Sequence, residues 1–321
     1  MLRRIALLLV FVPLFATAAA QEIRIDGSST VYPVALAIAE EFGIEFPAAR
    51  VSVAFSGTGA GFEKFCRGET DMTGASRPIK QSEVDLCAEN GIEFVEIPIA
   101  GDALTVIVNK DNTFATCMTT DELKMAWEPN SGVTTWADIR PEWPAEEIVF
   151  YGAGADSGTF DYFTEAIVGE SGAIRTDFFP SEDDNVLVLG VAGNEYAMGF
   201  FGFAYFVENQ DTLNAVEVDG GNGCVEPSAE NAASNVYIPL SRPLFEYVNI
   251  AKLDANPDLA AFIEFALASD LAREATAETG YLVYPDAIYE AAIARVTERV
   301  PGTVFATFQP GDSVLDALQQ R

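Results

Sequence analysis

The stretch FSGTGAGFEKFCRGETDMTGASRPI occupies residues 55–79 and carries the strongest indication of the fold. Its first part, residues 55–62, follows a strand-like run and opens a helix-like pattern over 59–68. Serine, threonine and glycine at such a turn offer hydroxyls and unpaired backbone N–H groups, which attract anions without any formal charge. The second part holds an isolated Asp71 and, six residues later, Arg77. The stretch therefore predicts a strand-to-helix turn suited to an anion.

Two other loops have the same chemistry, DGSSTVYP (26–33) and DSGTFDYF (156–163). Each also follows a strand-like run and opens a helix-like pattern. A serine at a single helix start is usually a plain N-cap, but three such turns in one chain favour a shared ligand. In open α/β sheets these turns lie at the carboxyl ends of strands, where ligands bind. None of the three is completed by the lysine and serine or threonine of a nucleotide P-loop.

Apolar, β-rich runs alternate with helical patterns along the chain, in a first set over 22–99 and a second over 101–223. Repeated strand–helix–strand order predicts an α/β fold with two mostly parallel sheets flanked by helices. Further helical patterns follow residue 250. We expect the chain to cross between the two halves near residues 98–101 and 235–239.

The N-terminus predicts export. Residues 1–20 combine Arg3 and Arg4, a short apolar run and small residues, which is the pattern of a cleaved signal peptide. Its removal takes the formal net charge from −31 to −33. A chain this acidic will not bind nucleic acid or anionic membranes through its overall field. Its 49% hydrophobic residues argue against disorder.

The chain contains no histidine, which removes the commonest general base and the commonest metal ligand. The four cysteines form no CxxC pair. An exported serine hydrolase or phosphatase using Ser56 or Ser157 would need a lysine base, and neither Lys64 nor Lys80 lies in a pattern that ties it to a serine. We therefore expect no enzyme activity, no cofactor and no metal.

The three loops, together with SEDDNVLVLGVAGNEYAMGFFGFAYF (181–206), resemble the periplasmic phosphate-binding proteins of phosphate ABC transporters. The resemblance covers nearly the whole mature chain. It implies the two-lobed type II periplasmic binding protein fold, with residues 21–99 and 238–321 in lobe I and 100–237 in lobe II. It also implies a monomer that encloses inorganic phosphate between its lobes and delivers it to a membrane permease.

The resemblance also implies a set of phosphate ligands. The first loop would supply hydroxyl and backbone donors, the second a serine and a close backbone approach, and the third the donors of the other lobe. Carried over by position, these residues are Ser29, Thr30, Val31, Ser56, Gly57, Asp71, Ser157, Gly158 and Thr159, with Ser28 as a weaker candidate.

Two charged residues complete this expected site. Some members of the family have an arginine where this chain has Ala153, so Arg77 is a candidate for the missing cation. The alternative is that Arg77 pairs with a nearby carboxylate such as Asp71. Asp71 would accept the proton that phosphate keeps at neutral pH, whereas sulfate and molybdate carry none and would leave it unpaired. Binding of another oxyanion and a role in surface adhesion remain alternatives.

The four cysteines permit three pairings. Cys66–Cys87 with Cys117–Cys224 keeps each bond inside one of the two expected lobes, so we prefer it over the other two pairings and over free thiols. Export to an oxidising compartment permits such bonds.

Overall fold

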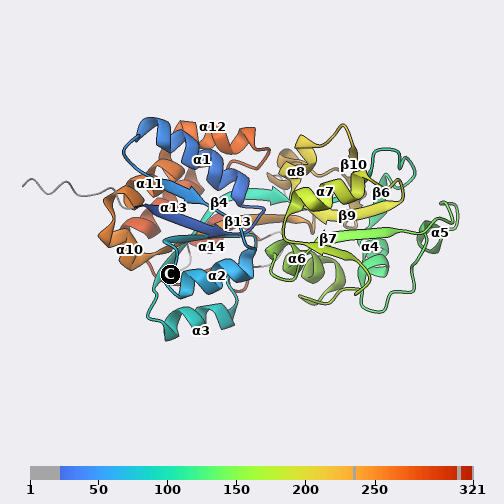
Figure 1. The fold of residues 1–321 in the computed structure, drawn as a ribbon, viewed down its shortest axis with the longest axis horizontal. Coiled ribbons are helices and arrows are strands. Elements are labelled where there is room, and N and C mark those ends of the chain that lie inside the picture. The colour runs from blue at the N-terminus through green and yellow to red at the C-terminus, as the bar shows by residue number, and fades with distance from the viewer. Residues whose placement is uncertain (1–21, 234–235, 309–311, 320–321) are drawn as a thin grey trace, which may run out of the picture.

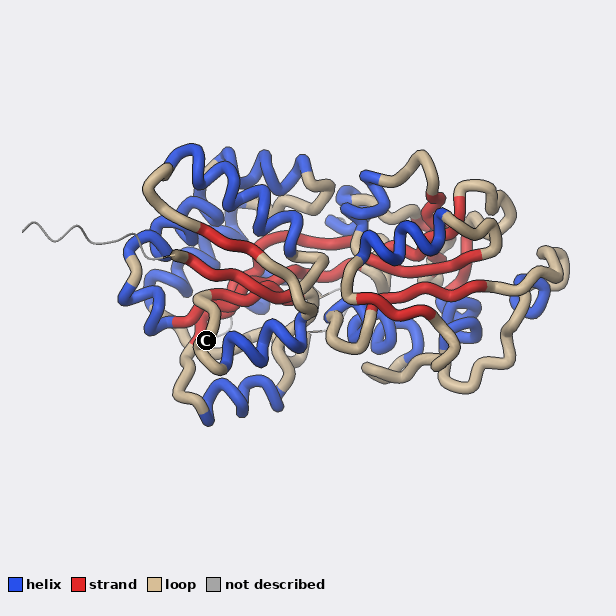
Figure 2. The backbone as a smooth tube through the Cα atoms, in the orientation of Figure 1, coloured by secondary structure: helices blue, strands red, loops and turns tan. Residues whose placement is uncertain are grey.

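The computed structural model describes residues 22–233, 236–308 and 312–319, so the predicted signal peptide lies outside the described residues. Two α/β bodies lie side by side along the long axis of the molecule (Figure 1). In each body helices flank a central sheet (Figure 2). Among the described helices, none has the length and apolar character needed to cross a bilayer.

The first body, which we call lobe I, is built on a five-stranded sheet. The strands β1, β2 and β3 are parallel and are connected by helices, as parallel strands require. The next strand of the sheet runs antiparallel to β3, and the last strand runs antiparallel to that one and so in the same direction as β1, β2 and β3. In order across the sheet the strands are β2 (Val51–Val53), β1 (Ile23–Gly27), β3 (Met72–Ala75), β13 (Ser241–Asn249) and β4 (Phe94–Ala103). Its helices are α1 (Tyr32–Glu45), α2 (Thr58–Cys66), α3 (Gln81–Glu89), α10 (Ile250–Ala255), α11 (Pro257–Ala268), α12 (Asp270–Glu278), α13 (Asp286–Glu298) and α14 (Val314–Leu318).

The second body, lobe II, has a second five-stranded sheet and a small three-stranded one. In order, the large sheet holds β10 (Leu213–Ala215), β5 (Thr105–Asn109), β9 (Ala197–Phe201), β7 (Val149–Ala153) and β8 (Phe179–Ser181). The small sheet holds β12 (Cys224–Val225), β11 (Glu217–Asp219) and β6 (Cys117–Thr119). The helical segments of this part of the chain are α4 (Thr120–Trp127), α5 (Trp136–Ile139), α6 (Gly158–Phe163), the π-helix η1 (Thr164–Val168), α7 (Asp184–Ala192), α8 (Phe203–Glu208) and α9 (Ala229–Ala233).

In each large sheet four of the five strands run in the same direction, so the predicted mostly parallel sheets are confirmed. The one reversed strand is β13 in lobe I and β5 in lobe II. Both lie where the chain crosses between the lobes. Strand β4 runs through the expected break near Gly101, and β5 follows after Leu104, so one extended segment leaves lobe I and enters lobe II. Strand β13 returns antiparallel to β4. Two neighbouring segments that cross between the lobes in opposite directions must be antiparallel. The other elements of both lobes have the predicted α/β arrangement.

The preferred disulfide pairing is confirmed. Cys66 bonds to Cys87 and ties α2 to α3 in lobe I. Cys117 bonds to Cys224 and ties β6 to β12 in lobe II. Each bond therefore stays within one lobe and leaves the two crossing segments without a covalent link.

Glu246 on β13 is an acid in the core of lobe I. Only 3% of the residue is exposed, and among the described residues its Oε2 has no hydrogen-bond partner. Burial raises the pKa of this carboxyl to about 8. The folded chain therefore holds Glu246 protonated at neutral pH.

Replacing Glu246 with glutamine should stabilise the protein at alkaline pH. Because the pKa is higher in the folded state, wild-type stability is lost as the pH rises from about 4.5 to about 8. Glutamine keeps the shape and removes the ionisation, so at pH 9 the free energy of unfolding should rise by about 2–4 kcal/mol. Urea unfolding at pH 5 and pH 9 measures this change. The exposed Glu63→Gln is the control, and an equal effect of Glu246→Gln at both pH values would contradict the prediction.

Candidate functional site

The three loops singled out from the sequence meet at the boundary between the lobes. The first two follow β1 and β2 in lobe I, and the third follows β7 in lobe II. Gly57 has a φ of 92° and lies against the backbone of Asp156 in the third loop. The N–H of Gly59 donates a 2.8 Å hydrogen bond to the carbonyl of Asp156. The second and third loops therefore touch directly across the lobe boundary.

Five buried hydroxyls gather at this contact, and we call them the hydroxyl cluster: Ser28, Thr30, Thr58, Ser76 and Thr159. Oγ1 of Thr30 in lobe I lies 2.8 Å from Oγ1 of Thr159 in lobe II. Ser28 donates to the hydroxyl of Ser76 at 3.0 Å, and that oxygen lies 3.4 Å from Oγ1 of Thr58. Hydroxyls can donate to an oxyanion without adding charge, so the cluster is chemically suited to one.

Gly158 allows the third loop to approach this cluster. A Cβ built on it would lie 2.5 Å from Oγ of Ser76 and 2.6 Å from Oγ1 of Thr58. Both distances are far below van der Waals contact. Any side chain at this position would therefore hold the lobes apart.

Arg242 on β13 is the cation of the site, and its side chain is fully buried. It lies opposite Asp102 of β4 in the sheet, and its Nε and one terminal nitrogen donate to that carboxylate at 3.0 and 2.8 Å. The same guanidinium donates to Oγ1 of Thr159 at 2.9 Å and to the carbonyl of Ser76 at 3.0 Å. Arg242 thus joins both lobes to the crossing strands.

The sequence did not indicate Thr58, Ser76 or Arg242 as site residues. Thr58 and Ser76 lie inside the opening stretch, beside Gly57 and Arg77, but a hydroxyl there gives no distinct signal. Arg242 did leave one, since it and Glu246 are the two charged residues within the mostly apolar run at 237–250. An apolar strand that keeps an arginine must provide it with a partner.

Of the residues expected from the sequence, Thr30, Gly158 and Thr159 lie in the contact itself. Ser157 caps α6 by accepting from the N–H of Thr159. Ser29 is buried beside them, and its carbonyl accepts a 3.0 Å hydrogen bond from the Tyr205 hydroxyl. Val31 immediately precedes α1, and its side chain packs against Gly74. Ser56 points elsewhere, because its hydroxyl donates to Asp26 at 2.8 Å, whereas the hydroxyl of Thr58 lies in the cluster.

Asp71 is not brought to this contact, which corrects the expectation from the sequence. It immediately precedes β3, whereas Ser76 immediately follows that strand. Its carboxylate accepts from the N–H of Arg24 at 2.8 Å and lies 3.7 Å from Nζ of Lys252. The five residues between Asp71 and Arg77 form the strand itself and the turn after it, so the two side chains lie at opposite ends of the sheet.

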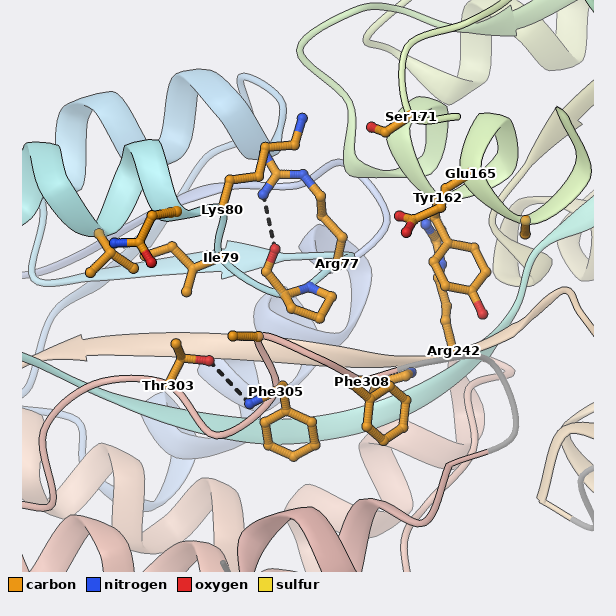
Figure 3. A pocket seen from close by; sticks show the side chains of 16 residues that line it. Arg77, Ile79, Lys80, Tyr162, Glu165, Ser171, Arg242, Thr303, Phe305 and Phe308 are labelled. Carbon is orange, nitrogen blue, oxygen red and sulfur yellow. Dashed lines mark hydrogen bonds between the residues drawn. The ribbon is translucent and has the colours of Figure 1, made fainter. Parts of the chain in front are cut away.

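Arg77 pairs with carboxylates, although not with Asp71. Its guanidinium donates to both oxygens of Glu83 in lobe I and to Asp161 of lobe II at 2.7 Å. Lys80 reaches the same oxygen of Asp161 at 2.7 Å. These contacts form an ion network across the lobe boundary. A cavity of about 390 Å³ adjoins it, and Arg77, Lys80, Tyr162 and Arg242 are among its lining residues (Figure 3).

Replacing Asp161 with asparagine should weaken anion binding by about 5- to 30-fold. The change removes the ion pairs that the buried Asp161 makes with Arg77 and Lys80 across the boundary only when the lobes are closed. These pairs should contribute about 1–2 kcal/mol to closure, because the Lys80 side chain is partly exposed. Titration calorimetry measures it. Glu83→Gln is the matched control, since it weakens a pair of the same arginine inside one lobe and should change affinity less than threefold. Equal effects of the two variants would contradict the prediction.

Comparison with known proteins shows which family contains chains similar to this one. Residues 16–270 match the model of a PBP superfamily domain. Protein SphX of Synechocystis is 46% identical over 92% of this chain and 87% of its own. Phosphate-binding protein PstS of Staphylococcus saprophyticus is 38% identical over 84% of this chain and 82% of its own.

The chain belongs to the PstS family of phosphate-binding proteins.

A solved member supports the same assignment. A candidate phosphate ABC transporter substrate-binding protein of Clostridium perfringens, determined with bound phosphate, superposes with a TM-score of 0.70. It is 26% identical and covers 83% of this chain and 100% of its own. PstS proteins are binding proteins rather than enzymes. The family thus agrees with a site that has hydroxyl donors and an arginine but no histidine.

Proposed function

We propose that the chain binds inorganic phosphate between its lobes and delivers it to the permease of an ABC transporter. The convergence of three donor loops and Arg242 on one buried contact carries this proposal. Thr30, Thr58, Gly158, Thr159 and Arg242 would surround the anion. Because Oγ1 of Thr30 and Oγ1 of Thr159 are 2.8 Å apart, the lobes must open to admit phosphate. Closure then replaces hydroxyl–hydroxyl contacts with contacts to phosphate oxygens.

We also propose that residues 1–20 direct the chain to the periplasm, where it acts as a monomer. The lobes would comprise 21–99 with 238–321, and 100–237. The hydrophobic cores of the described residues support this division. One core uses residues up to Ala100 and from Leu244 onward, together with Ala204, while the other two lie entirely between Ala103 and Leu240. The crossing segments between them would act as the hinge.

Native mass spectrometry of the purified protein tests the function. We expect one added mass of phosphate per chain, lost after unfolding and dialysis and restored by adding phosphate. Sulfate and molybdate serve as competitors, because binding of either in preference to phosphate would favour the alternative oxyanion function. Failure to bind any of the three would contradict the proposal.

A further inference from the structure

Glu182, in the turn between β8 and α7, holds the start of the third loop from within lobe II. Its Oε1 accepts a 3.1 Å hydrogen bond from the N–H of Asp156. One residue earlier in the turn, the carbonyl of Ser181 accepts a 3.0 Å hydrogen bond from the N–H of Gly154. The pairing of β7 with β8 ends at Ala153 and Ser181. A backbone bond and then a side-chain bond therefore continue that pairing into the loop.

Gly154 and Glu182 are matched in size. A Cβ built on Gly154 would overlap Oε1 of Glu182 and lie 2.8 Å from its Cδ. The φ of Gly154 lies outside the left-handed region that favours glycine. The close approach of the carboxylate, and not the conformation of the backbone, therefore requires glycine at this position.

Asp156 carries this restraint to the lobe boundary. Its N–H and its carbonyl belong to the two peptide groups on either side of it. The N–H is bound by Glu182, and the carbonyl accepts the 2.8 Å hydrogen bond from the N–H of Gly59 in lobe I. The second peptide group also joins Asp156 to Ser157 and so leads directly into the donors of the third loop. Glu182 therefore restrains a residue that both contacts lobe I and precedes those donors.

A contribution to the stability of lobe II does not by itself explain a carboxylate at this position. Glu182 is half-buried, and its Oε2 is buried without a hydrogen-bond partner among the described residues. Burial raises the pKa of Glu182, the N–H of Asp156 lowers it, and the carboxylates of Asp156 and Asp161 raise it, so that the net direction is upward. The surroundings thus disfavour the charge, and the hydrogen bond that Glu182 gains in return is the one that holds the third loop.

We propose that Glu182 is a positioning residue for phosphate binding, which orients the third loop so that the lobes can close without reordering it. This inference rests on the proposed phosphate function, and Glu182 acts through Asp156 rather than on the anion. When the lobes are open, the carbonyl of Asp156 lacks its partner Gly59. A loop that already has its closed conformation loses less conformational freedom when the lobes meet. The effect should therefore appear in the lifetime of the closed complex rather than in the first encounter with phosphate.

Phosphate binding by the whole purified protein tests this role, with calorimetry for affinity and stopped-flow fluorescence for the two rates. Glu182→Ala should lower phosphate affinity about 5- to 20-fold, chiefly through faster dissociation, with association within about twofold of wild type. Glu182→Gln keeps Oε1 as an acceptor, so its affinity should stay within about threefold of wild type. Glu195→Ala is the matched control, because it removes an exposed carboxylate of the same lobe.

Gly154→Ala tests the same contact from the other side. The new methyl group should displace the flexible Glu182 side chain, so phosphate affinity should fall by the same factor as in Glu182→Ala. In the double variant the methyl group has room. Its affinity should therefore equal that of Glu182→Ala alone, whereas losses that multiply would overturn the proposed role.

The remaining outcomes separate this inference from the function on which it rests. A wild type that binds no phosphate overturns the proposed function. A wild type that binds phosphate, with unchanged affinity and rates in Glu182→Ala, overturns the role of Glu182 alone, and so does an equal loss of affinity in Glu182→Gln. If Glu182→Ala does not fold, as judged by circular dichroism, Gly154→Ala decides: an affinity within twofold of wild type overturns the role.

Discussion

Replacing Arg242 with methionine should abolish phosphate binding and lower the free energy of unfolding by about 3–5 kcal/mol. Arg242 and Asp102 have fully buried side chains and form the only ion pair in the described part of the chain with both partners at 0% exposure. Methionine fills a similar volume but leaves the Asp102 carboxylate facing only the N–H of Phe203, at 3.2 Å. The loss of stability follows from this uncompensated charge.

Binding should be lost for a separate reason. The guanidinium of Arg242 donates to Thr159 at 2.9 Å and approaches Oγ1 of Thr30 at 3.4 Å, so it orients the two hydroxyls that face each other across the boundary. It is also the one cation in direct hydrogen-bond contact with the hydroxyl cluster in the described residues. Without Arg242, the anion would lie next to neutral hydroxyl donors and the unpaired carboxylate of Asp102.

The double variant Asp102→Asn with Arg242→Met separates the two effects. It removes both charges, so it should recover part of the lost stability while phosphate binding stays absent. Urea unfolding and titration calorimetry give the two readouts. Retention of phosphate affinity within threefold of wild type in Arg242→Met would refute the assignment of this cation.

Replacing Gly158 with alanine should lower phosphate affinity by about 30- to 150-fold and leave the stability of the ligand-free protein nearly unchanged. The new methyl group would lie 2.5 and 2.6 Å from the hydroxyls of Ser76 and Thr58. Relieving such overlap in a packed contact costs about 2–3 kcal/mol. The clash exists only when the lobes are closed, because Gly158 and the two hydroxyls belong to different lobes.

Small-angle scattering in excess phosphate shows whether the variant closes, and calorimetry measures its affinity. We expect the radius of gyration to stay near its ligand-free value at phosphate concentrations that compact the wild type. Gly59→Ala is the matched control, since its Cβ would lie no closer than 3.6 Å to the backbone of Asp156. If Gly158→Ala closes at the phosphate concentrations that close the wild type, glycine is not required at this position and the prediction is wrong.

Local sequence patterns were sufficient to predict the three anion-binding loops. Thr30, Gly158 and Thr159 stand at turns whose chemistry depends on neighbouring residues, so a short motif predicts both the turn and its donors. The order of strand and helix patterns along the chain was also sufficient to predict the two α/β bodies. The disulfide pairing followed from that division, because a bond within one lobe leaves the other free to move.

Residues away from these motifs could not be placed in this way. Asp71 and Arg77 share one short stretch, but a strand rises about 3.3 Å per residue, so four residues of β3 separate their ends of the sheet. Arg242 reaches the carbonyl of Ser76 across 166 residues of sequence. Only the pairing of β13 with β3 and β4 brings these groups together.

The sequence by itself therefore determined the α/β class, the two-body organisation, the anion-binding loops and the absence of histidine chemistry. The tertiary structure decided which charged side chain contacts the hydroxyls of those loops: it brings Arg242 to them, whereas Arg77 pairs with carboxylates and Asp71 lies at the other end of β3. The physical reason is that hydroxyls and backbone N–H groups are positioned by the turn that contains them. A buried charge is instead positioned by long-range sheet pairing and lobe closure, which supply its partners from distant parts of the chain.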